Sequence, residues 1–357
     1  MNIKIITMHA MHNPGSIFQA YATQQYLSGE NNTEVIDYQP AYFFTESNKI
    51  KFIIKKLLYY RYYASRSKRF DDFIKDNFVL TKKVTTYDEL KAQKFDADVF
   101  VVGSDQLWNS DFECGKDDAY VLGFTGKPKI SYATSVGKEE INPFEKERLS
   151  KYLKDFTAVS VREEKTAGQL EQILGREVKW VCDPVFLLKR DDYMKFVMKT
   201  NKMEEPYVMV YLSEASETLS RITDYFEKHG YKIILLGGFT KRCNCAYHIK
   251  DAGPVEFLSY IYNADYVISS SFHATAFCHI FHKKFATLLP NANYERIMSL
   301  LRLSGLEYRA VREGFDVKNV DREVDWYDVD SRIEEHIIES KKYLDSAVEK
   351  VRAGMEA

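Results

Sequence analysis

The chain has 357 residues, of which 45% are hydrophobic, and its formal net charge is −2. This length favours two domains of ordinary size, and the nearly balanced charge argues against a general nucleic-acid binder. Nothing in the sequence reaches the roughly 18 apolar residues that a membrane-spanning helix needs. Five cysteines scattered over a long chain fit reduced thiols, so we expect a cytoplasmic protein.

Short apolar runs alternate with helical patterns along most of the chain, which predicts parallel sheets built from βαβ units. A first set of strands is expected at Ile3–Met8, Glu34–Ile36, Val99–Val102, Lys129–Ala133, Ala158–Val161 and Val178–Val181. After a polar stretch at Lys199–Glu205, a second set is expected at Tyr207–Leu212, Lys232–Leu236, Tyr266–Ser269 and Ala286–Leu289.

These two sets predict an α/β protein with two doubly wound, Rossmann-like domains facing a cleft. The expected bounds are residues 1–200 for the first domain and 201–330 for the second. Residues 331–357 carry apolar side chains at helical spacing and are expected to form a C-terminal closing helix.

The first expected strand runs into a polar turn around Asn13. Asn13 is a good N-cap and Pro14 suits the first helical position, so a helix is expected to begin here. The turn is either a well-capped helix start and nothing more, or a ligand-binding loop. In the second case Gly15 permits close approach of a substrate, and Asn13 and Gln19 offer polar contacts.

The segment Lys49–Arg69 holds eight basic residues and no acidic one, interleaved with tyrosines and apolar residues. Such a helix can lie on the anionic face of a membrane. The alternative is a packed helix whose Lys and Arg stems cover apolar neighbours.

A dense polar cluster with a tryptophan follows the expected strand Val99–Val102. Its residues are Ser104, Asp105, Gln106, Trp108 and Asn109. In a sugar site, Trp108 would stack on a ring while the amides and the carboxylate take the hydroxyls. The equal alternative is a capped turn in which Trp108 anchors the core.

Arg162 stands at the end of another expected strand. It can clamp a carboxylate or phosphate with two hydrogen bonds, or form a surface pair with Glu163 or Glu164. Asp183, which precedes Pro184, is expected to have a structural role.

The stretch from Ser269 to Phe277 directly follows an apolar run. It predicts a buried strand ending in hydroxyls, a sharp turn, and a helix whose first turn carries His273. Anions bind where backbone N–H groups and the positive end of a helix meet, and His273 could transfer a proton there. The spacing of His273, His279 and His282 does not match a zinc signature, so no metal is expected.

Taken together, these motifs resemble the polysaccharide pyruvyl transferase family over most of residues 1–310. The residues that carry the resemblance occur in the family's order. They are Asn13-Pro14-Gly15 with Gln19-Ala20-Tyr21, Gly103 to Asn109, Ser131 to Gly137, Ser160 to Glu163, Asp183-Pro184, Gly253 to Phe257 and Ser271-Phe272-His273.

The resemblance implies a fold like the two-domain GT-B glycosyltransferases, and transfer of pyruvate from phosphoenolpyruvate to a sugar as a ketal. The product would be a capsule, exopolysaccharide or cell-wall glycan, or its lipid-linked precursor. Phosphoenolpyruvate would be a co-substrate, with no cofactor, and the protein would work in the cytoplasm or at the inner face of the membrane.

The resemblance also implies site roles. His273 would be the catalytic acid. The donor would be bound by Arg162, Ser271, Phe272 and Arg296. The acceptor would be bound by Asn13, Gly15, Gln19, Ser104, Asp105, Gln106, Trp108 and Asn109.

One position departs from the family pattern, because some members carry an arginine where this chain has Ser271. Arg162, Arg296 or Lys241 can supply the missing charge. Two other functions stay open: a GT-B glycosyltransferase that uses a nucleotide sugar, with Glu256 contacting the nucleotide, and a non-catalytic glycan-binding relative.

Overall fold

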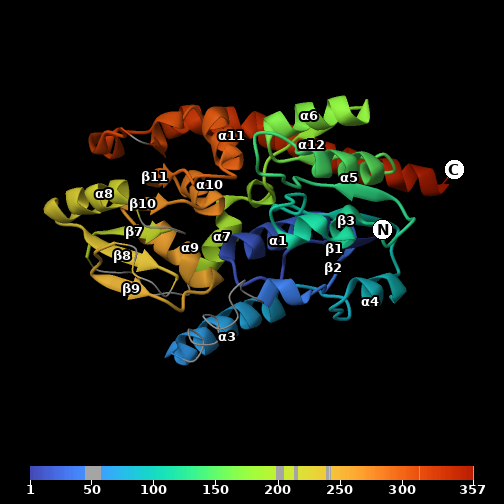
Figure 1. The fold of residues 1–357 in the computed structure, drawn as a ribbon, viewed down its shortest axis with the longest axis horizontal. Helices are drawn as coiled ribbons and strands as arrows, with labels where there is room; N and C mark the ends of the chain where they lie inside the picture. Colours follow the sequence, from blue (N-terminus) through green and yellow to red (C-terminus); the bar gives the residue numbers. More distant parts are fainter. Residues whose placement is uncertain are drawn as a thin grey trace. The chain divides into compact units, whose positions relative to one another are not determined.

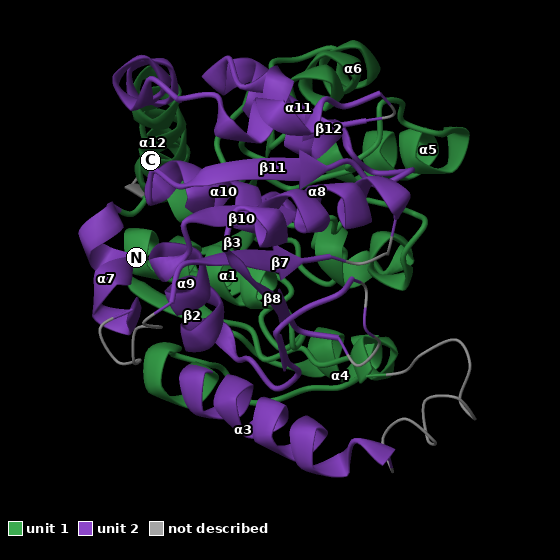
Figure 2. Ribbon diagram, turned by 90° about the vertical axis from the view of Figure 1, so that its left-hand side faces the viewer, with its two compact units in different colours: residues 1–49, 74–188, 334–357 green, residues 50–73, 189–333 purple. Residues whose placement is uncertain are grey.

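The computed structural model describes residues 1–44, 58–197, 205–212, 216–238, 241, 243–312 and 314–356. The chain divides into two compact units (Figure 2). Unit 1 comprises residues 1–49, 74–188 and 334–357, and unit 2 comprises residues 50–73 and 189–333. These bounds differ from the continuous domains expected from the sequence. Residues 50–73 join unit 2, and the end of the chain joins unit 1.

Unit 1 is built on a parallel sheet in the order β2-β1-β3-β4 (β1, β2 and β3 are labelled in Figure 1). Isolated bridges from Ile130 to Ala158 and from Thr134 to Val161 link the region of β4 to that of the pair β5-β6. The strands of unit 1 are β1 (Asn2–Ile6), β2 (Asn32–Val35), β3 (Val99–Val102), β4 (Lys129–Ser131), β5 (Ser160–Val161) and β6 (Lys179–Trp180). Its helices are α1 (Pro14–Leu27), α4 (Tyr87–Ala92), α5 (Pro143–Leu153) and α6 (Glu164–Leu174).

Unit 2 has a parallel sheet in the order β12-β11-β10-β7-β8-β9. Its strands are β7 (Tyr207–Tyr211), β8 (Lys232–Leu236), β9 (Tyr247–Ile249), β10 (Tyr266–Ser269), β11 (Lys284–Leu288) and β12 (Ala310–Val311). Its helices are α7 (Arg190–Val197), α8 (Glu217–Lys228), α9 (Pro254–Asn263), α10 (Phe272–Ile280) and α11 (Glu295–Ser304).

Two longer helices belong partly to each unit. They are α3 (Tyr60–Asn77) and α12 (Trp326–Glu356), and the unit boundary falls inside both. Every strand expected from the sequence overlaps an observed one, so the α/β class with parallel sheets is confirmed. The expected polar joint lies almost entirely outside the described residues, as do residues 49–57 of the basic segment.

Local sequence signals explain where several helices begin and end. Asn13 caps α1 by accepting a hydrogen bond from the Gly15 N–H at 2.9 Å, and Pro14 is the first helical residue, as predicted. Asn142 and Glu145 form a capping box at the start of α5. Helix α11 ends at Gly305, whose φ of 69° lies in the left-handed region that glycine tolerates.

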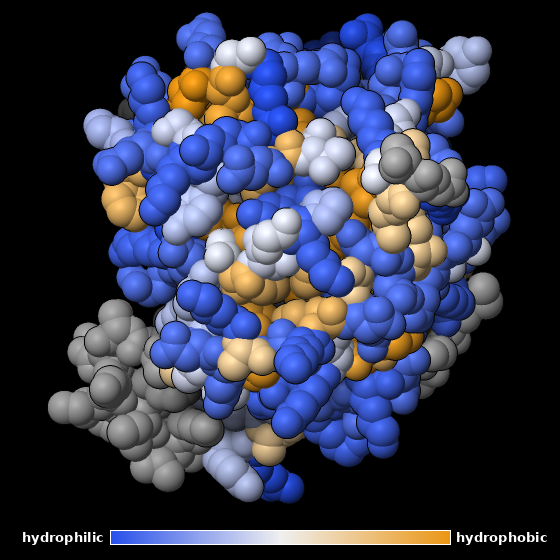
Figure 3. Space-filling view, turned by 90° about the vertical axis from the view of Figure 1, so that its right-hand side faces the viewer, coloured by the Kyte–Doolittle hydropathy of each residue, from blue (hydrophilic) through white to orange (hydrophobic). Residues whose placement is uncertain are grey.

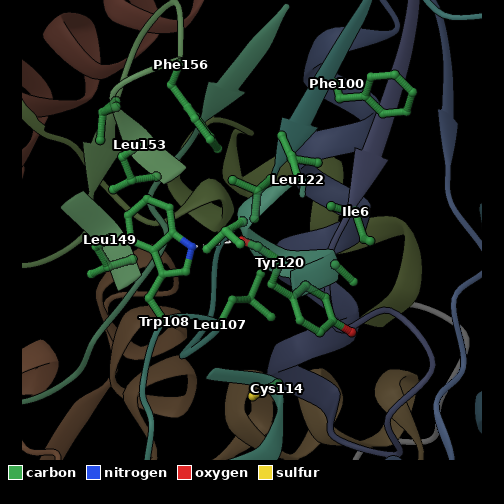
Figure 4. Close-up of a cluster of buried hydrophobic side chains, with 14 of the residues drawn as sticks. Ile6, Phe100, Leu107, Trp108, Cys114, Tyr120, Leu122, Leu149, Leu153 and Phe156 are labelled. Atoms are coloured by element: carbon green, nitrogen blue, oxygen red, sulfur yellow. Dashed lines mark hydrogen bonds between the residues drawn. The ribbon is translucent and has the colours of Figure 1, made fainter. Parts of the chain in front are cut away.

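Each unit has its own hydrophobic core beside its sheet. In unit 1 the cluster includes side chains from β1, β3 and α5, among them those drawn in Figure 4. Figure 3 shows one face of the molecule, where most side chains are hydrophilic and the hydrophobic ones lie in patches among them. Within the described residues, no helix is both long enough and apolar enough to cross a membrane.

Candidate functional site

In unit 2 the strand order changes direction between β7 and β10. In open parallel sheets, ligands bind outside the carboxyl ends of the strands at this kind of switch point. Ser269 ends β10 there, and its hydroxyl donates a hydrogen bond to the Tyr211 carbonyl at 2.8 Å, which ties the ends of the two central strands together. The same oxygen accepts the Ser271 N–H at 2.9 Å and so fixes the turn that follows.

Helix α10 begins directly after this turn. Ser271 is its N-cap, and the Ser271 hydroxyl accepts the Ala274 N–H. His273 is therefore the second helical residue and lies in the first turn, as the sequence predicts, with a side chain that is almost completely buried. Because the first N–H groups of a helix lack partners within the helix, this turn offers hydrogen bonds and positive potential to an anion.

The other two histidines of this segment have structural neighbours. His279 lies 2.8 Å from the Thr275 carbonyl through Nδ1 and 3.1 Å from the Ser304 hydroxyl through Nε2, and burial lowers its pKa to about 4. His282 contacts the Asp330 carboxylate at 3.0 Å and stacks on Trp326. These contacts connect α10 to α11, and the turn after α10 to the first part of α12, within unit 2.

Arg296 is the second residue of α11, and α11 follows β11, the parallel neighbour of β10. Arg296 therefore follows the same edge of the unit 2 sheet as Ser271 and His273. Its side chain is half-buried. Of the residues expected to bind the donor, Ser271, Phe272 and Arg296 share this unit with His273, whereas Arg162 belongs to unit 1.

In unit 1 the sheet order changes direction between β1 and β3. The two predicted polar loops, around Asn13 and Ser104, follow these two strands. Gln19, which is fully buried, donates from Nε2 to the Thr7 hydroxyl at 2.9 Å and to the Ser16 carbonyl at 2.8 Å. It thereby fastens α1 to the carboxyl end of β1.

Asp105 holds the second loop in an unusual backbone conformation, with a φ of 84°. Non-glycine residues seldom adopt such a φ, so the surrounding contacts must maintain it. The Asp105 carboxylate accepts hydrogen bonds from the Ser16 hydroxyl at 2.6 Å and from the Gln106 N–H at 2.9 Å. Asp105 thus joins the loop after β3 to the first turn of α1.

Arg162 follows β5 and is almost fully buried among three carboxylates. Its guanidinium lies 2.6 Å from Asp183, 3.8 Å from Glu163 and 3.9 Å from Asp105. Burial alone would lower the pKa of Arg162, but the three carboxylates outweigh it and raise the pKa. The expected alternative of a surface pair is wrong, because the arginine and its partners are inside the unit.

Two further hydroxyls complete this buried network. Ser104 donates to the Asp183 carboxylate at 3.0 Å, and Ser135 donates to Glu163. Asp183 also caps the short helix that follows it by accepting the Val185 N–H at 3.1 Å, as its expected structural role requires. The sequence suggested Glu163 only as a surface partner of Arg162, and it did not single out Ser16 or Ser135, although all three lie in motifs that it identified.

Gln106 and Asn109 bind each other, because the Asn109 amide donates to Gln106 Oε1 at 3.0 Å. Gly137 makes room for them: a Cβ at Gly137 would collide with Gln106 Oε1. Trp108 lies in the hydrophobic core of unit 1, where its Nε1–H donates a hydrogen bond to the Tyr120 carbonyl at 2.8 Å (Figure 4). The structure therefore favours the core anchor over a ring that stacks on a sugar.

A family model described as polysaccharide pyruvyl transferase matches residues 13–291. The chain belongs to this family. The matched span begins at Asn13, after β1, and it includes the loop after β3 as well as β7, β10 and His273. Membership makes the protein a transferase and supports a part in polysaccharide pyruvylation, with a sugar or polysaccharide as acceptor. A comparison with curated proteins gives no match.

Solved structures that resemble this polysaccharide pyruvyl transferase family member are enzymes with the GT-B fold. A UDP-GlcNAc 2-epimerase from Neisseria meningitidis superposes with a TM-score of 0.57 at 10% identity, covering 98% of this chain and 100% of the other. Phytolacca americana UGT2 gives a TM-score of 0.54 at 11% identity, covering 98% and 99%. A UDP-GlcNAc 2-epimerase from Methanocaldococcus jannaschii gives 0.52 at 13% identity, covering 90% and 91%. At these identities the likeness shows the fold alone, and it confirms the GT-B class.

Proposed function

We propose that the protein transfers the pyruvyl group of phosphoenolpyruvate to two hydroxyls of a sugar, forming a ketal on a bacterial polysaccharide or its lipid-linked precursor. The observation that carries this proposal is His273 in the first turn of α10, at the switch point of unit 2 in a chain of this family. Phosphoenolpyruvate is made in the cytoplasm, so the reaction would take place there.

The reaction needs an acid beside the alkene of phosphoenolpyruvate. His273 would donate a proton to the methylene carbon, which leaves an oxocarbenium-like centre at C2. A sugar hydroxyl adds to C2 and loses its proton, which can restore the imidazolium. Phosphate then leaves with its bonding electrons, a second hydroxyl adds to C2, and its proton goes to phosphate. The products are the ketal and inorganic phosphate, so no oxidant or cofactor is required.

The donor anion would bind at the start of α10. The N–H groups of the first turn, beside Ser271 and Phe272, suit a carboxylate or a phosphate. Arg296, which follows the neighbouring strand, would supply the positive charge that Ser271 does not. The three carboxylates around Arg162 more than balance its positive charge, which makes Arg296 the better residue to bind the donor anion.

The acceptor would bind at the switch point of unit 1. Asn13, Gly15 and the loop from Ser104 to Asn109 follow the two strands that flank this point. Gln19 would act through position, because its amide holds α1 against β1. Amide and carboxylate oxygens at such an edge suit the hydroxyls of a sugar.

If the protein were a glycosyltransferase that uses a nucleotide sugar, Glu256 would contact the nucleotide. The Glu256 carboxylate instead accepts the Gly253 N–H at 3.0 Å and lies 3.0 Å from Arg69, so it is engaged within unit 2. This geometry favours the pyruvyl donor. A transferase that releases a nucleoside diphosphate, or a glycan-binding relative with no turnover, remains a distinct outcome of the assay below.

The test is release of phosphate from phosphoenolpyruvate in the presence of sugar acceptors, for the wild type and His273→Ala. Removing a general acid is expected to slow turnover about 100- to 10,000-fold while the fold persists, as circular dichroism would check. His229→Ala is the matched control, because His229 is an exposed histidine of the same unit. Wild-type turnover in His273→Ala would disprove the assignment, and nucleoside diphosphate released from a sugar nucleotide would establish the alternative.

A further inference from the structure

The loop after β3 carries an exposed phenylalanine directly beyond the candidate acceptor residues. The Phe112 N–H donates a hydrogen bond to the Asn109 carbonyl at 3.1 Å, and the Gly115 N–H donates one to the Phe112 carbonyl at 3.1 Å. A Cβ at Gly115 would collide with the Asn109 carbonyl, so the two ends of this short loop lie against each other. The backbone on both sides of Phe112 is therefore fixed, while 43% of the Phe112 surface stays exposed.

The start of α5, the helix that follows β4, carries a second exposed phenylalanine (α5 is labelled in Figures 1 and 2). Phe144 lies between the capping-box residues Asn142 and Glu145 and is 50% exposed. The almost fully buried Glu145 accepts the Ser110 N–H and the Ser110 hydroxyl, both at 2.8 Å. The Asn142 amide also donates to the Ser110 hydroxyl at 2.8 Å. These bonds join the loop after β3 to the start of α5, so both rings stand on one rigid connection.

The polar groups around this connection favour a neutral ligand that carries hydroxyls. Lys138 lies 2.8 Å from the Asp111 carboxylate and 2.9 Å from the Glu145 carboxylate, so two negative charges surround one positive charge and would repel an anion. The Asp111 side chain is 52% exposed, so its carboxylate can accept further hydrogen bonds. A sugar offers hydroxyls to such groups and an apolar face to an aromatic ring. Two rings among charged side chains are too little for a protein partner, whose interface takes about 20 to 30 residues a side.

We propose that Phe112 and Phe144 form a subsite for the sugars next to the one that is modified, so that the acceptor is a glycan chain rather than a single sugar. The inference rests on the proposed acceptor site of unit 1 and extends it. Asn109, at the end of that site, bonds to the Phe112 backbone, so a glycan that leaves the site along this loop meets the Phe112 ring. The two phenylalanines would thus supply the stacking that the buried Trp108 does not.

The test is isothermal titration calorimetry of the full chain, without phosphoenolpyruvate, against linear oligosaccharides of glucose, galactose, mannose and N-acetylglucosamine, from single sugars to hexasaccharides. We expect the affinity for at least one series to rise with chain length. Phe112→Ala and Phe144→Ala should each weaken binding of the longer members of that series roughly 2- to 10-fold, the usual value of one aromatic contact, and leave binding of the single sugar unchanged. The double variant Phe112→Tyr with Phe144→Tyr keeps both rings and should bind like the wild type.

The matched control is Tyr247→Ala with Tyr327→Ala, which removes two exposed aromatic rings from unit 2 and should bind every oligosaccharide like the wild type. Affinity that is independent of chain length in every series would overturn the proposal, as would a length dependence that persists in Phe112→Ala with Phe144→Ala. Light scattering tests for another occupant. If loss of the two rings dissociates an oligomer, this surface is a contact between copies of the chain and not a glycan subsite.

These binding measurements need no turnover, so they separate the subsite from the proposed reaction. If oligosaccharides bind with the expected length dependence but no phosphate is released from phosphoenolpyruvate, the subsite stands and pyruvyl transfer fails. If phosphate is released with the same kcat/KM for single sugars and oligosaccharides, pyruvyl transfer stands and the subsite fails.

Discussion

Arg162 brings a guanidinium into a part of unit 1 that water barely reaches, together with three carboxylates. An arginine placed in this way is well suited to hold other groups, because its fixed fork of donors orients several acceptors at once. Asp183 and Asp105 both pair with its guanidinium. Asp183 accepts a hydrogen bond from Ser104, and Asp105 accepts one from Ser16, so the network connects the end of β3, the start of α1 and the start of the short helix Pro184–Phe186. We therefore assign Arg162 the positioning of the loops that follow β1 and β3.

Substitution of Arg162 by Met should destabilise the protein by about 3–5 kcal/mol, since it leaves buried carboxylates without their cation. Urea unfolding would measure the change. Arg221→Met, at an exposed position of α8, is the control and should change the free energy of unfolding by less than about 0.5 kcal/mol. An Arg162 variant with normal stability and a raised KM for phosphoenolpyruvate would return this residue to the donor site.

Residue roles differ in how far local sequence determines them. The caps Asn13 and Ser271 were predictable, because a cap bonds to an N–H only two or three residues away. The role of Trp108 was not predictable, because the choice between a sugar platform and a core anchor depends on the Tyr120 carbonyl and on packing across the sheet. The burial of Arg162 likewise depends on Asp183, which lies 21 residues along the chain.

At the scale of elements, α3 and α9 approach closely at Gly253, the N-cap of α9. A Cβ at this position would lie 2.6 Å from the Cβ of Arg69, an atom too near the α3 backbone to move aside. The φ of Gly253 is −95°, which any residue can adopt, so glycine is needed here for space alone.

Gly253→Ala should therefore separate α3 from α9 and lower the free energy of unfolding by about 1–3 kcal/mol, the usual cost of overpacking. Chemical denaturation would measure it. Gly126→Ala is the control, because a Cβ at Gly126 meets nothing within 4 Å, and it should be nearly neutral. If both alanine variants unfold alike, the close approach does not contribute to stability.

Most of the sheet could be predicted from the sequence, because buried parallel strands are continuous apolar runs. The two strands missed were β9, three residues that include His248, and β12, which has only Ala310 and Val311. Both lie at the edges of their sheet, where strands are short and partly exposed. Too few apolar residues remain there to form a recognisable pattern.

At the scale of the whole molecule, each unit is built from separate segments of the chain, and the sequence pattern could not predict this. The apolar residues at the end of α12 predict a helix without saying which core it covers. In the structure they pack in unit 1, where the Tyr343 hydroxyl donates to the Ser131 carbonyl at 3.0 Å and the Ser340 hydroxyl accepts the Cys182 N–H at 2.8 Å. The part of α12 from residue 334 onward therefore belongs to unit 1.

Leu344→Ala should destabilise unit 1 by about 2–5 kcal/mol, because Leu344 is fully buried. In a Trp326→Phe background the remaining tryptophans, Trp108 and Trp180, both report on unit 1, so their fluorescence during urea unfolding would measure it. Ile338→Ala, at an exposed site on the same helix, serves as control. A loss of stability that this fluorescence does not detect would contradict the assignment of the helix to unit 1.

The return of α12 to unit 1 also sets the order in which the protein can mature on the ribosome. Domains usually fold in the order of their synthesis, with the N-terminal one first. Here residues 334–357 are synthesised after every residue of unit 2, which ends at residue 333, and they belong to the same unit as residues 1–49. Unit 1 is therefore completed only after the whole of unit 2 has been synthesised, so its unfinished core must be kept from aggregating, for example by chaperones, while unit 2 takes shape.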